Sequence, residues 1–117
     1  MKMFAALFIG LIAADVSGKW TLHYDQDFSG HPATYQCTLR QQGQKLTATC
    51  DNGGVTLTGQ VEDRKVTFEH TTGKNNDIVV HYTGMLNQEG SFMKGAWQYI
   101  DPRDKKEKTG RFAFEKQ

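Results

Sequence analysis

The sequence predicts an all-β protein, an eight-stranded antiparallel up-and-down β-barrel. Apolar and polar residues alternate with a period of two from Asp15 onward, which is typical of strands that bury one face. Short joints rich in Gly, Asn and Asp separate the alternating segments, and such joints connect antiparallel neighbours. Eight strands in about 100 residues favour closure over an open sandwich, because a closed barrel leaves no unpaired sheet edge.

The alternating segments follow one another with little chain between them. Trp20, Leu22 and Tyr24 form the apolar face of the first segment, and Leu57 and Val61 belong to that of the fourth. The expected strands are Gly18–Asp25, Ala33–Gln41, Lys45–Asp51, Val55–Glu62, Lys65–Thr72, Asp77–Leu86, Phe92–Ile100 and Thr109–Glu115. Short joints are expected at 42–44, 51–54, 62–64 and 87–90, and longer connections at 28–32, 73–76 and 101–108.

Tight turns predict the register of three hairpins. The turns would be centred on residues 43–44, 63–64 and 88–89, and each aligns apolar residues with apolar residues. The expected partners are Gln41 with Leu46, Leu39 with Ala48, Cys37 with Cys50, Val61 with Val66, Gly59 with Phe68, Leu57 with His70, Gly84 with Met93, Tyr82 with Gly95, and Val80 with Trp97. A slip of one residue would turn every side chain to the other face.

The same alternation predicts which side chains face the interior of the barrel. The outward positions are mostly Thr, Gln, Arg, Lys and Glu. The expected inward set is Trp20, Leu22, Tyr24, Tyr35, Cys37, Leu39, Leu46, Ala48, Cys50, Val55, Leu57, Val61, Val66, Phe68, His70, Ile78, Val80, Tyr82, Leu86, Met93, Trp97, Tyr99, Phe112 and Phe114. Three glycines on this face, Gly59, Gly84 and Gly95, would leave space or mark bends.

The composition describes one ordinary globular domain. The 117 residues are 38% hydrophobic and 23% charged, with 14 Lys and Arg against 13 Asp and Glu. A chain of this length forms a single core. A net charge of +1 excludes a strongly basic protein, so no nucleic acid partner is expected.

Residues 1–14 are expected to be a secretory signal peptide, and residues 15–117 the barrel domain. Lys2 supplies a positive start, residues 4–14 form an apolar run, and the small Ala14 ends it. The run is shorter than the roughly 20 residues that span a membrane, so no integral membrane segment is expected after processing. Export would make the protein secreted or periplasmic. A retained N-terminal helix, as a membrane anchor or a plug, is the alternative.

Cys37 and Cys50 are expected to form a disulfide. The hairpin count places them opposite each other at a non-hydrogen-bonded pair, where cross-strand side chains come closest. An exported chain with an even number of cysteines supports the bond. Two buried free thiols, or half of a metal site, are the alternatives.

Gly18-Lys19-Trp20 opens the first strand, and Arg111 lies in the last. A Gly-x-Trp on the first strand with an Arg on the final strand resembles the signature of the calycins, the superfamily of lipocalins, fatty-acid-binding proteins and avidins. The chain also resembles small secreted bacterial lipocalin-like domains from residue 15 to residue 116. The resemblance implies two structural residues: Trp20 would close one end of the barrel, and Arg111 would pack across its ring.

Aromatic residues indicate a ligand site inside the barrel. By the alternation, the four tyrosines, one histidine and one tryptophan face inward, and buried hydroxyls need hydrogen-bond partners. An aromatic-lined cavity that holds a small apolar or amphipathic molecule would supply such partners. Large side chains that simply fill the barrel are the alternative. The candidate ligand-binding residues are Tyr24, Tyr35, His70, Tyr82, Trp97 and Tyr99.

No catalytic residue, metal site or cofactor is expected. The alternation turns His23 and His81 outward, and His31 lies in a loop, which leaves His70 as the inward histidine. The serines lack a nucleophile elbow. We therefore expect a non-catalytic binding protein. An envelope or extracellular module that binds or inhibits a protein partner through its surface loops is the alternative, and a calycin-type enzyme is the third hypothesis.

Overall fold

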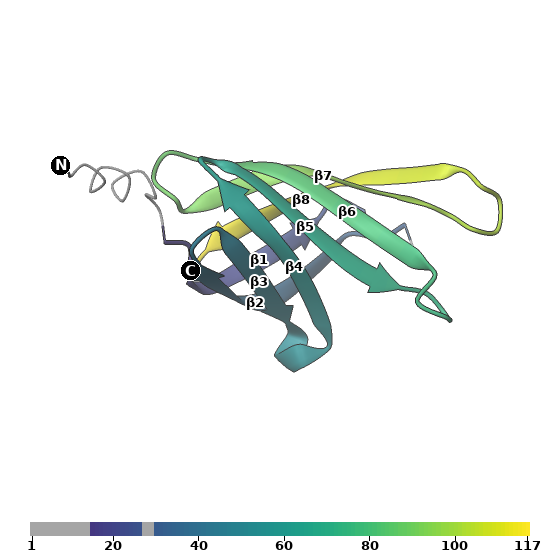
Figure 1. Cartoon of the computed structure of the whole chain (residues 1–117), viewed down its shortest axis with the longest axis horizontal. Helices are drawn as coiled ribbons and strands as arrows, with labels where there is room; N and C mark the ends of the chain where they lie inside the picture. Colours follow the sequence, from purple (N-terminus) through teal and green to yellow (C-terminus); the bar gives the residue numbers. More distant parts are fainter. Residues whose placement is uncertain (1–14, 27–29) are drawn as a thin grey trace.

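The computed structural model describes residues 15–26 and 30–117, so the expected signal peptide lies outside the described residues. Eight strands form one closed antiparallel barrel, in which each strand pairs with its neighbours along the chain and β8 pairs with β1 (Figure 1). The predicted fold class is confirmed. The strands are β1 (Gly18–Tyr24), β2 (Ala33–Gln42), β3 (Lys45–Cys50), β4 (Val55–Glu62), β5 (Lys65–Thr72), β6 (Ile78–Leu86), β7 (Phe92–Ile100) and β8 (Glu107–Lys116).

Ten of the sixteen strand ends lie at the predicted residue, and the other six differ from it by one or two residues. The chain leaves β3 at Cys50 and enters a short 3₁₀ turn, η1 (Asp51–Gly53), which was predicted only as a joint. A hydrogen bond from the Gly54 backbone N–H to the Asp51 carbonyl (3.1 Å) closes the turn. The turn leads directly into β4, so that β3 and β4 pair from Cys50–Val55 onward.

Two of the three predicted registers are confirmed. Cys37 lies opposite Cys50 on β2 and β3, and Val61 lies opposite Val66 on β4 and β5. The recorded pairing of β4 with β5 runs from Thr58–Glu69 to Glu62–Lys65, so the expected pair of Leu57 with His70 lies beyond it.

The predicted register of β6 with β7 is wrong by two residues. Tyr82 lies opposite Trp97, and Leu86 lies opposite Met93. The cause is the connection, which is longer than the expected two-residue turn: Asn87 Oδ1 accepts hydrogen bonds from the backbone N–H groups of Ser91 (2.9 Å) and Phe92 (3.2 Å). A shift of two residues keeps each side chain on its predicted face, because side chains alternate with a period of two.

The core fills the interior with the predicted face of each strand. Most of the expected inward residues are less than 9% exposed, and Val16, which precedes β1, joins them. The largest fully buried side chains are Trp20, Tyr82, Phe68 and Phe114. Five residues of the expected inward set are only half-buried, namely Tyr35, Val55, His70, Ile78 and Tyr99.

The two ends of the barrel differ. At one end, which we call the Trp20 end, the Trp20 Nε1–H donates to the Val16 carbonyl (2.8 Å), and the Val16 N–H donates to Gln41 Oε1 (2.9 Å). The segment before β1 therefore covers this end of the core. At the other end, which we call the Tyr24 end, β1 finishes and β2 begins. Strands β4 and β6 also begin at this end, and their first residues, Val55 and Ile78, are half-buried.

Candidate functional site

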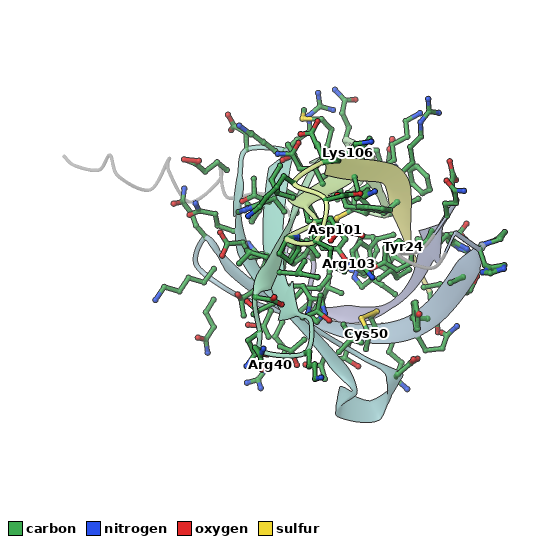
Figure 2. The ribbon with its side chains drawn as sticks, turned by 90° about the vertical axis from the view of Figure 1, so that its right-hand side faces the viewer. Tyr24, Arg40, Cys50, Asp101, Arg103 and Lys106 are labelled. Atoms are coloured by element: carbon green, nitrogen blue, oxygen red, sulfur yellow. A yellow bond between two sulfur atoms is a disulfide. The ribbon has the colours of Figure 1, made fainter. Side chains whose placement is uncertain are left out.

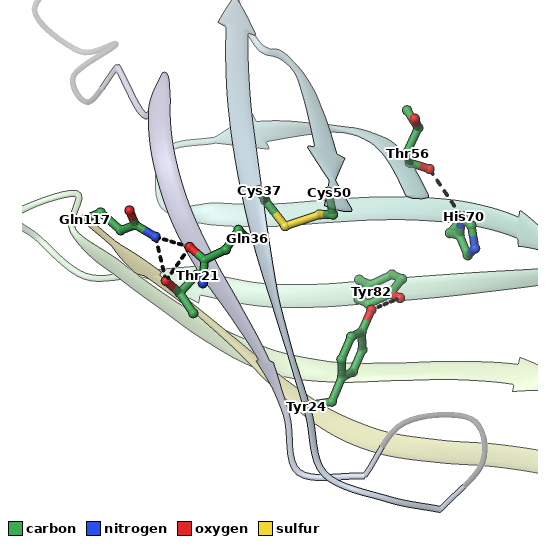
Figure 3. The surroundings of a disulfide bond; sticks show 9 residues. All are labelled: Thr21, Tyr24, Gln36, Cys37, Cys50, Thr56, His70, Tyr82 and Gln117. Atoms are coloured by element: carbon green, nitrogen blue, oxygen red, sulfur yellow. Dashed lines mark hydrogen bonds between the residues drawn. A yellow bond between two sulfur atoms is a disulfide. The ribbon is translucent and has the colours of Figure 1, made fainter. Parts of the chain in front are cut away.

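Two buried tyrosines form the polar centre of the Tyr24 end. Tyr24 on β1 and Tyr82 on β6 are 6% and 1% exposed, and their hydroxyl oxygens lie 2.6 Å apart in a hydrogen bond (Figure 3). A buried hydroxyl needs such a partner, because it has lost its hydrogen bonds to water. Burial, together with the neighbouring Tyr24, raises the pKa of Tyr82 far above its ordinary value. Tyr82 is therefore neutral and keeps its proton for hydrogen bonding.

Further aromatic rings surround this pair. Tyr35 packs edge-to-face on Tyr24 with ring centroids 5.8 Å apart, and Phe112 packs in the same way on Tyr82 at 5.2 Å. Pairs of this geometry add to the energy of burial. The structure thus brings three of the six predicted site residues, Tyr24, Tyr35 and Tyr82, into one cluster.

Trp97 and Tyr99 form a second group on β7, next to the first. Their rings stack with centroids 5.9 Å apart and planes inclined by 17°. Trp97 lies opposite Tyr82 in the sheet, so the two groups are adjacent through that pair. Trp97 is buried, whereas Tyr99 is half-buried and gives the group an accessible edge.

A glycine that the sequence analysis did not single out makes room for this stack. Gly110 on β8 lies opposite Trp97, and a Cβ at Gly110 would come within 2.4 Å of the Trp97 ring. A residue with any side chain would therefore displace the indole. The signal in the sequence was a glycine inside a strand, which often marks a close approach of another group.

His70 does not join the aromatic cluster. Its ring is half-buried on β5, and Nδ1 lies 3.3 Å from the carbonyl oxygen of Thr56 on the neighbouring strand β4 (Figure 3). The His70 side chain therefore forms its hydrogen bond along the barrel wall, with the neighbouring strand. Among the described residues, no group of three or more His, Cys, Asp or Glu side chains could hold a metal ion.

The structure corrects the role expected for Arg111. Arg111 is exposed and lies opposite Ala96, whereas its neighbours Phe112 and Phe114 are buried. Its parity in the strand therefore turns it outward. Lys116 takes the expected place beside Trp20: it lies opposite Trp20 in the sheet, and its Nζ is 5.8 Å from the centroid of the ring. A cation at this distance from an indole is attracted by the ring quadrupole.

The three inward glycines mark bends rather than space. A Cβ at Gly59 would lie 1.7 Å from the Thr67 carbonyl oxygen, and one at Gly95 would lie 1.9 Å from the Thr83 carbonyl oxygen. At these points the backbone of the paired strand lies so close to the glycine that a side chain would not fit. The sequence allowed two interpretations of these glycines, namely that they leave space or that they mark bends. The close contacts support sharp curvature of the barrel wall and not an empty interior.

The β7–β8 connection is ordered by its own charges. The Asp101 carboxylate accepts hydrogen bonds from the backbone N–H of Arg103 (2.9 Å) and from its guanidinium (3.0 and 3.1 Å), so the two residues lie side by side in Figure 2. These bonds hold the pKa of Asp101 at about 2. These contacts lie within the connection that directly follows the end of β7.

No protein-family model matches the chain, and no curated protein matches it. The eight-stranded antiparallel barrel fits a calycin-like fold. In the described part of the chain, no helix has the length and apolar character needed to cross a membrane.

The hydrogen bond between the two tyrosines can be tested by a double-mutant cycle. Tyr82→Phe should lower the free energy of unfolding by about 2 kcal/mol, because it leaves the buried Tyr24 hydroxyl without this partner. Tyr24→Phe should lower the free energy of unfolding by a similar amount. The double variant should cost less than the sum of the two, since neither hydroxyl then remains to be satisfied. Urea unfolding measures all four proteins, and purely additive losses would contradict the coupling.

Proposed function

We propose that the protein is an exported, non-catalytic barrel that binds a small apolar or amphipathic molecule at its Tyr24 end. The observation that carries the proposal is the set of aromatic residues at this end, half-buried at the rim and hydroxyl-bearing beneath it. Tyr35 and Tyr99 offer ring surface to solvent, and the Tyr24–Tyr82 pair lies below them. Sites for small molecules commonly combine apolar walls with a few placed polar groups.

The chemistry of the rim indicates the class of ligand. Its half-buried hydrophobic members are Ala33, Tyr35, Val55, Ile78 and Tyr99, and the half-buried His70 lies at the same end. Such a rim favours a hydrocarbon chain or ring system. The Tyr82 hydroxyl beneath is neutral, because burial raises its pKa, so it favours a hydroxyl or carbonyl group over a charged one as the polar part of the ligand.

Export is supported by the cysteine pair. Cys37 and Cys50 form a disulfide, and disulfides persist in oxidising compartments such as the periplasm or the extracellular space. The chemistry of the start of the chain agrees, because residues 1–14 have the order of a signal peptide.

Contact quenching can locate the binding site. The probe is methyl 9,10-dibromostearate, an uncharged ester that quenches tryptophan only at close range. Two single-tryptophan proteins, Trp20→Phe and Trp97→Phe, separate the two ends of the barrel. We expect saturable quenching in Trp20→Phe, which retains Trp97 beside Tyr99, and little in Trp97→Phe, which retains the covered Trp20.

The affinity should depend on the rim. Tyr99→Ala should raise the Kd for the probe about tenfold, because it removes one aromatic wall and its stack on Trp97. Met85→Ala is the matched control, since Met85 is an exposed apolar residue, at 53%, on the outer face. Equal quenching at both tryptophans, or equal loss of affinity in both alanine variants, would exclude this site. Native mass spectrometry of protein purified from its own host then identifies any small molecule that it carries.

A further inference from the structure

The wall of the barrel divides between β6 and β7 near the Tyr24 end. The recorded pairing of these strands ends at His81–Gln98. Beyond it, β6 continues to Ile78 in pairing with β5, and β7 continues to Ile100 in pairing with β8. Figure 1 shows the β5–β6 and β7–β8 hairpins diverging past this point. We call the gap between them the β6–β7 fork.

Two residues present backbone hydrogen-bonding groups to the fork. In an antiparallel pair, alternate residues direct their N–H and C=O groups at the same neighbour. The Asn87 N–H donates to the Phe92 carbonyl (2.8 Å), and counting by twos from this pair reaches Val79 on β6 and Ile100 on β7. Both residues therefore direct N–H and C=O groups into the fork, and within residues 30–117 the recorded β6–β7 pairing stops before it reaches them.

Apolar side chains lie beside these edges. Val79 is 41% exposed and Ile100 is 57% exposed, although both are large hydrophobic residues. Together with Tyr99, they line a hollow of about 300 Å³. The fork thus joins apolar surface to backbone edges that are ready to pair, and exposed edges of this kind are templates for another strand.

Two carboxylates flank the apolar part of the fork. Asp77 precedes Val79 by two residues, and Glu107 lies opposite Ile100 on β8; both acids line the hollow. An apolar segment with a basic residue at each end would meet apolar surface at its centre and a carboxylate at either side.

We propose that the β6–β7 fork binds an extended peptide segment as an added β-strand, with apolar residues at the centre of the segment and basic residues at its ends. Val79 and Ile100 provide the main-chain hydrogen bonds, and Asp77 and Glu107 select the charge. A second copy of the chain is disfavoured as the occupant, because its fork would bring the same two carboxylates against them. This site adjoins the proposed small-molecule site, with which it shares Tyr99, but the argument for it does not depend on that proposal.

The test uses the peptide Lys-Thr-Val-Thr-Ile-Thr-Lys-amide, with fluorescein attached to its N-terminus through a Gly-Gly linker, in fluorescence anisotropy titrations of the full chain. Its Lys, Val and Ile side chains share one face when it is extended. We expect saturable binding, and affinity lower by about tenfold for the matched peptide with Glu at both ends. The backbone amide resonances of Val79 and Ile100 should shift on titration.

Two controls separate charge recognition from strand pairing. Asp77→Asn combined with Glu107→Gln should weaken binding of the lysine peptide about tenfold. Glu89→Gln, an exposed acid in the 87–91 connection at the other end, should leave it unchanged. Peptides N-methylated at alternate amides along either edge should both lose binding, because a strand inserted in the fork faces β6 with one edge and β7 with the other.

Several results would overturn the proposal. They are the absence of saturable binding, equal affinity for the glutamate peptide, and unchanged binding of a peptide that is N-methylated along either edge. A dimer in sedimentation that the Asp77→Asn and Glu107→Gln changes strengthen would identify a second copy of the chain as the occupant instead. Because the N-methylated peptides leave the protein unchanged, the test does not depend on the folding of any variant.

Discussion

Replacing Gly59 with alanine is expected to lower the free energy of unfolding by about 3 kcal/mol or more. The added Cβ would lie 1.7 Å from the Thr67 carbonyl oxygen and 2.8 Å from the Phe68 Cα. Both are backbone atoms of the paired strand β5, so no rotation of a side chain relieves the overlap, and the two strands must move apart. Urea unfolding followed by far-UV circular dichroism measures the loss.

Gly54→Ala is the matched control for this prediction. Gly54 has an ordinary φ of −70°, and an added Cβ there meets its nearest atom at 3.4 Å. Its replacement should change stability by less than about 1 kcal/mol, with stabilisation the favoured sign because alanine restricts the unfolded chain. Gly95→Ala should behave like Gly59→Ala, since its Cβ would lie 1.9 Å from the Thr83 carbonyl oxygen. Equal stability of Gly59→Ala and Gly54→Ala would contradict the close approach of β4 and β5.

The alternation of residues predicted which face of the sheet each side chain occupies better than it predicted the register between neighbouring strands. Leu39, Leu57 and Phe114 are buried as expected, because a side-chain period of two determines inside and outside locally. The same rule cannot detect a slip of two residues. The β6–β7 register was therefore wrong while the faces of Tyr82 and Trp97 were right. The decisive information was the side chain of Asn87, whose hydrogen bonds extend the connection.

The alternation of side chains along β8 also indicates which residue lies beside Trp20, whereas the calycin resemblance indicated the wrong one. Phe112 and Phe114 face inward, so Lys116 shares their face and Arg111 does not. The position beside Trp20 then follows from the pairing of β1 with β8, in which Lys116 is the partner of Trp20. Pairing between the first and last strands depends on closure of the barrel, which local pattern does not specify.

The sequence predicted which residues make up the candidate site better than it predicted how these residues contact one another. The face of Tyr24, Tyr35 and Tyr82 follows from alternation, but their mutual contacts depend on strands that are far apart in sequence. His70 has the same parity, yet its hydrogen bond to Thr56 turns it along the wall. The fork was not predicted, because two hairpins that diverge have the same local pattern as two that stay paired.

Removal of the disulfide is expected to lower the free energy of unfolding by about 3 kcal/mol, since the bond closes a loop with a sequence separation of 13. Cys37→Ala and Cys50→Ala each break it, and so does the double variant. The free energy of unfolding of the three proteins should therefore fall by similar amounts, because one crosslink is lost in every case and the effects of the two substitutions are not additive. Additive losses would show instead that packing of the two buried sulfur atoms, and not the crosslink, stabilises the hairpin. Urea unfolding of oxidised wild-type protein is the reference, and intact mass after alkylation without reductant confirms its bond.

The disulfide also connects stability to the proposed binding site. Cys37 follows Tyr35 by two residues on β2, and Tyr35 packs on Tyr24 with ring centroids 5.8 Å apart. Loss of the crosslink frees β2 from β3 just inside the rim, so Tyr35 should become more mobile even where the barrel stays folded. We therefore expect Cys37→Ala with Cys50→Ala to weaken binding of methyl 9,10-dibromostearate under conditions in which circular dichroism still reports a folded protein. Unchanged affinity in the folded double variant would mean that the rim is held by its aromatic contacts alone, and that the disulfide serves only the stability of the barrel.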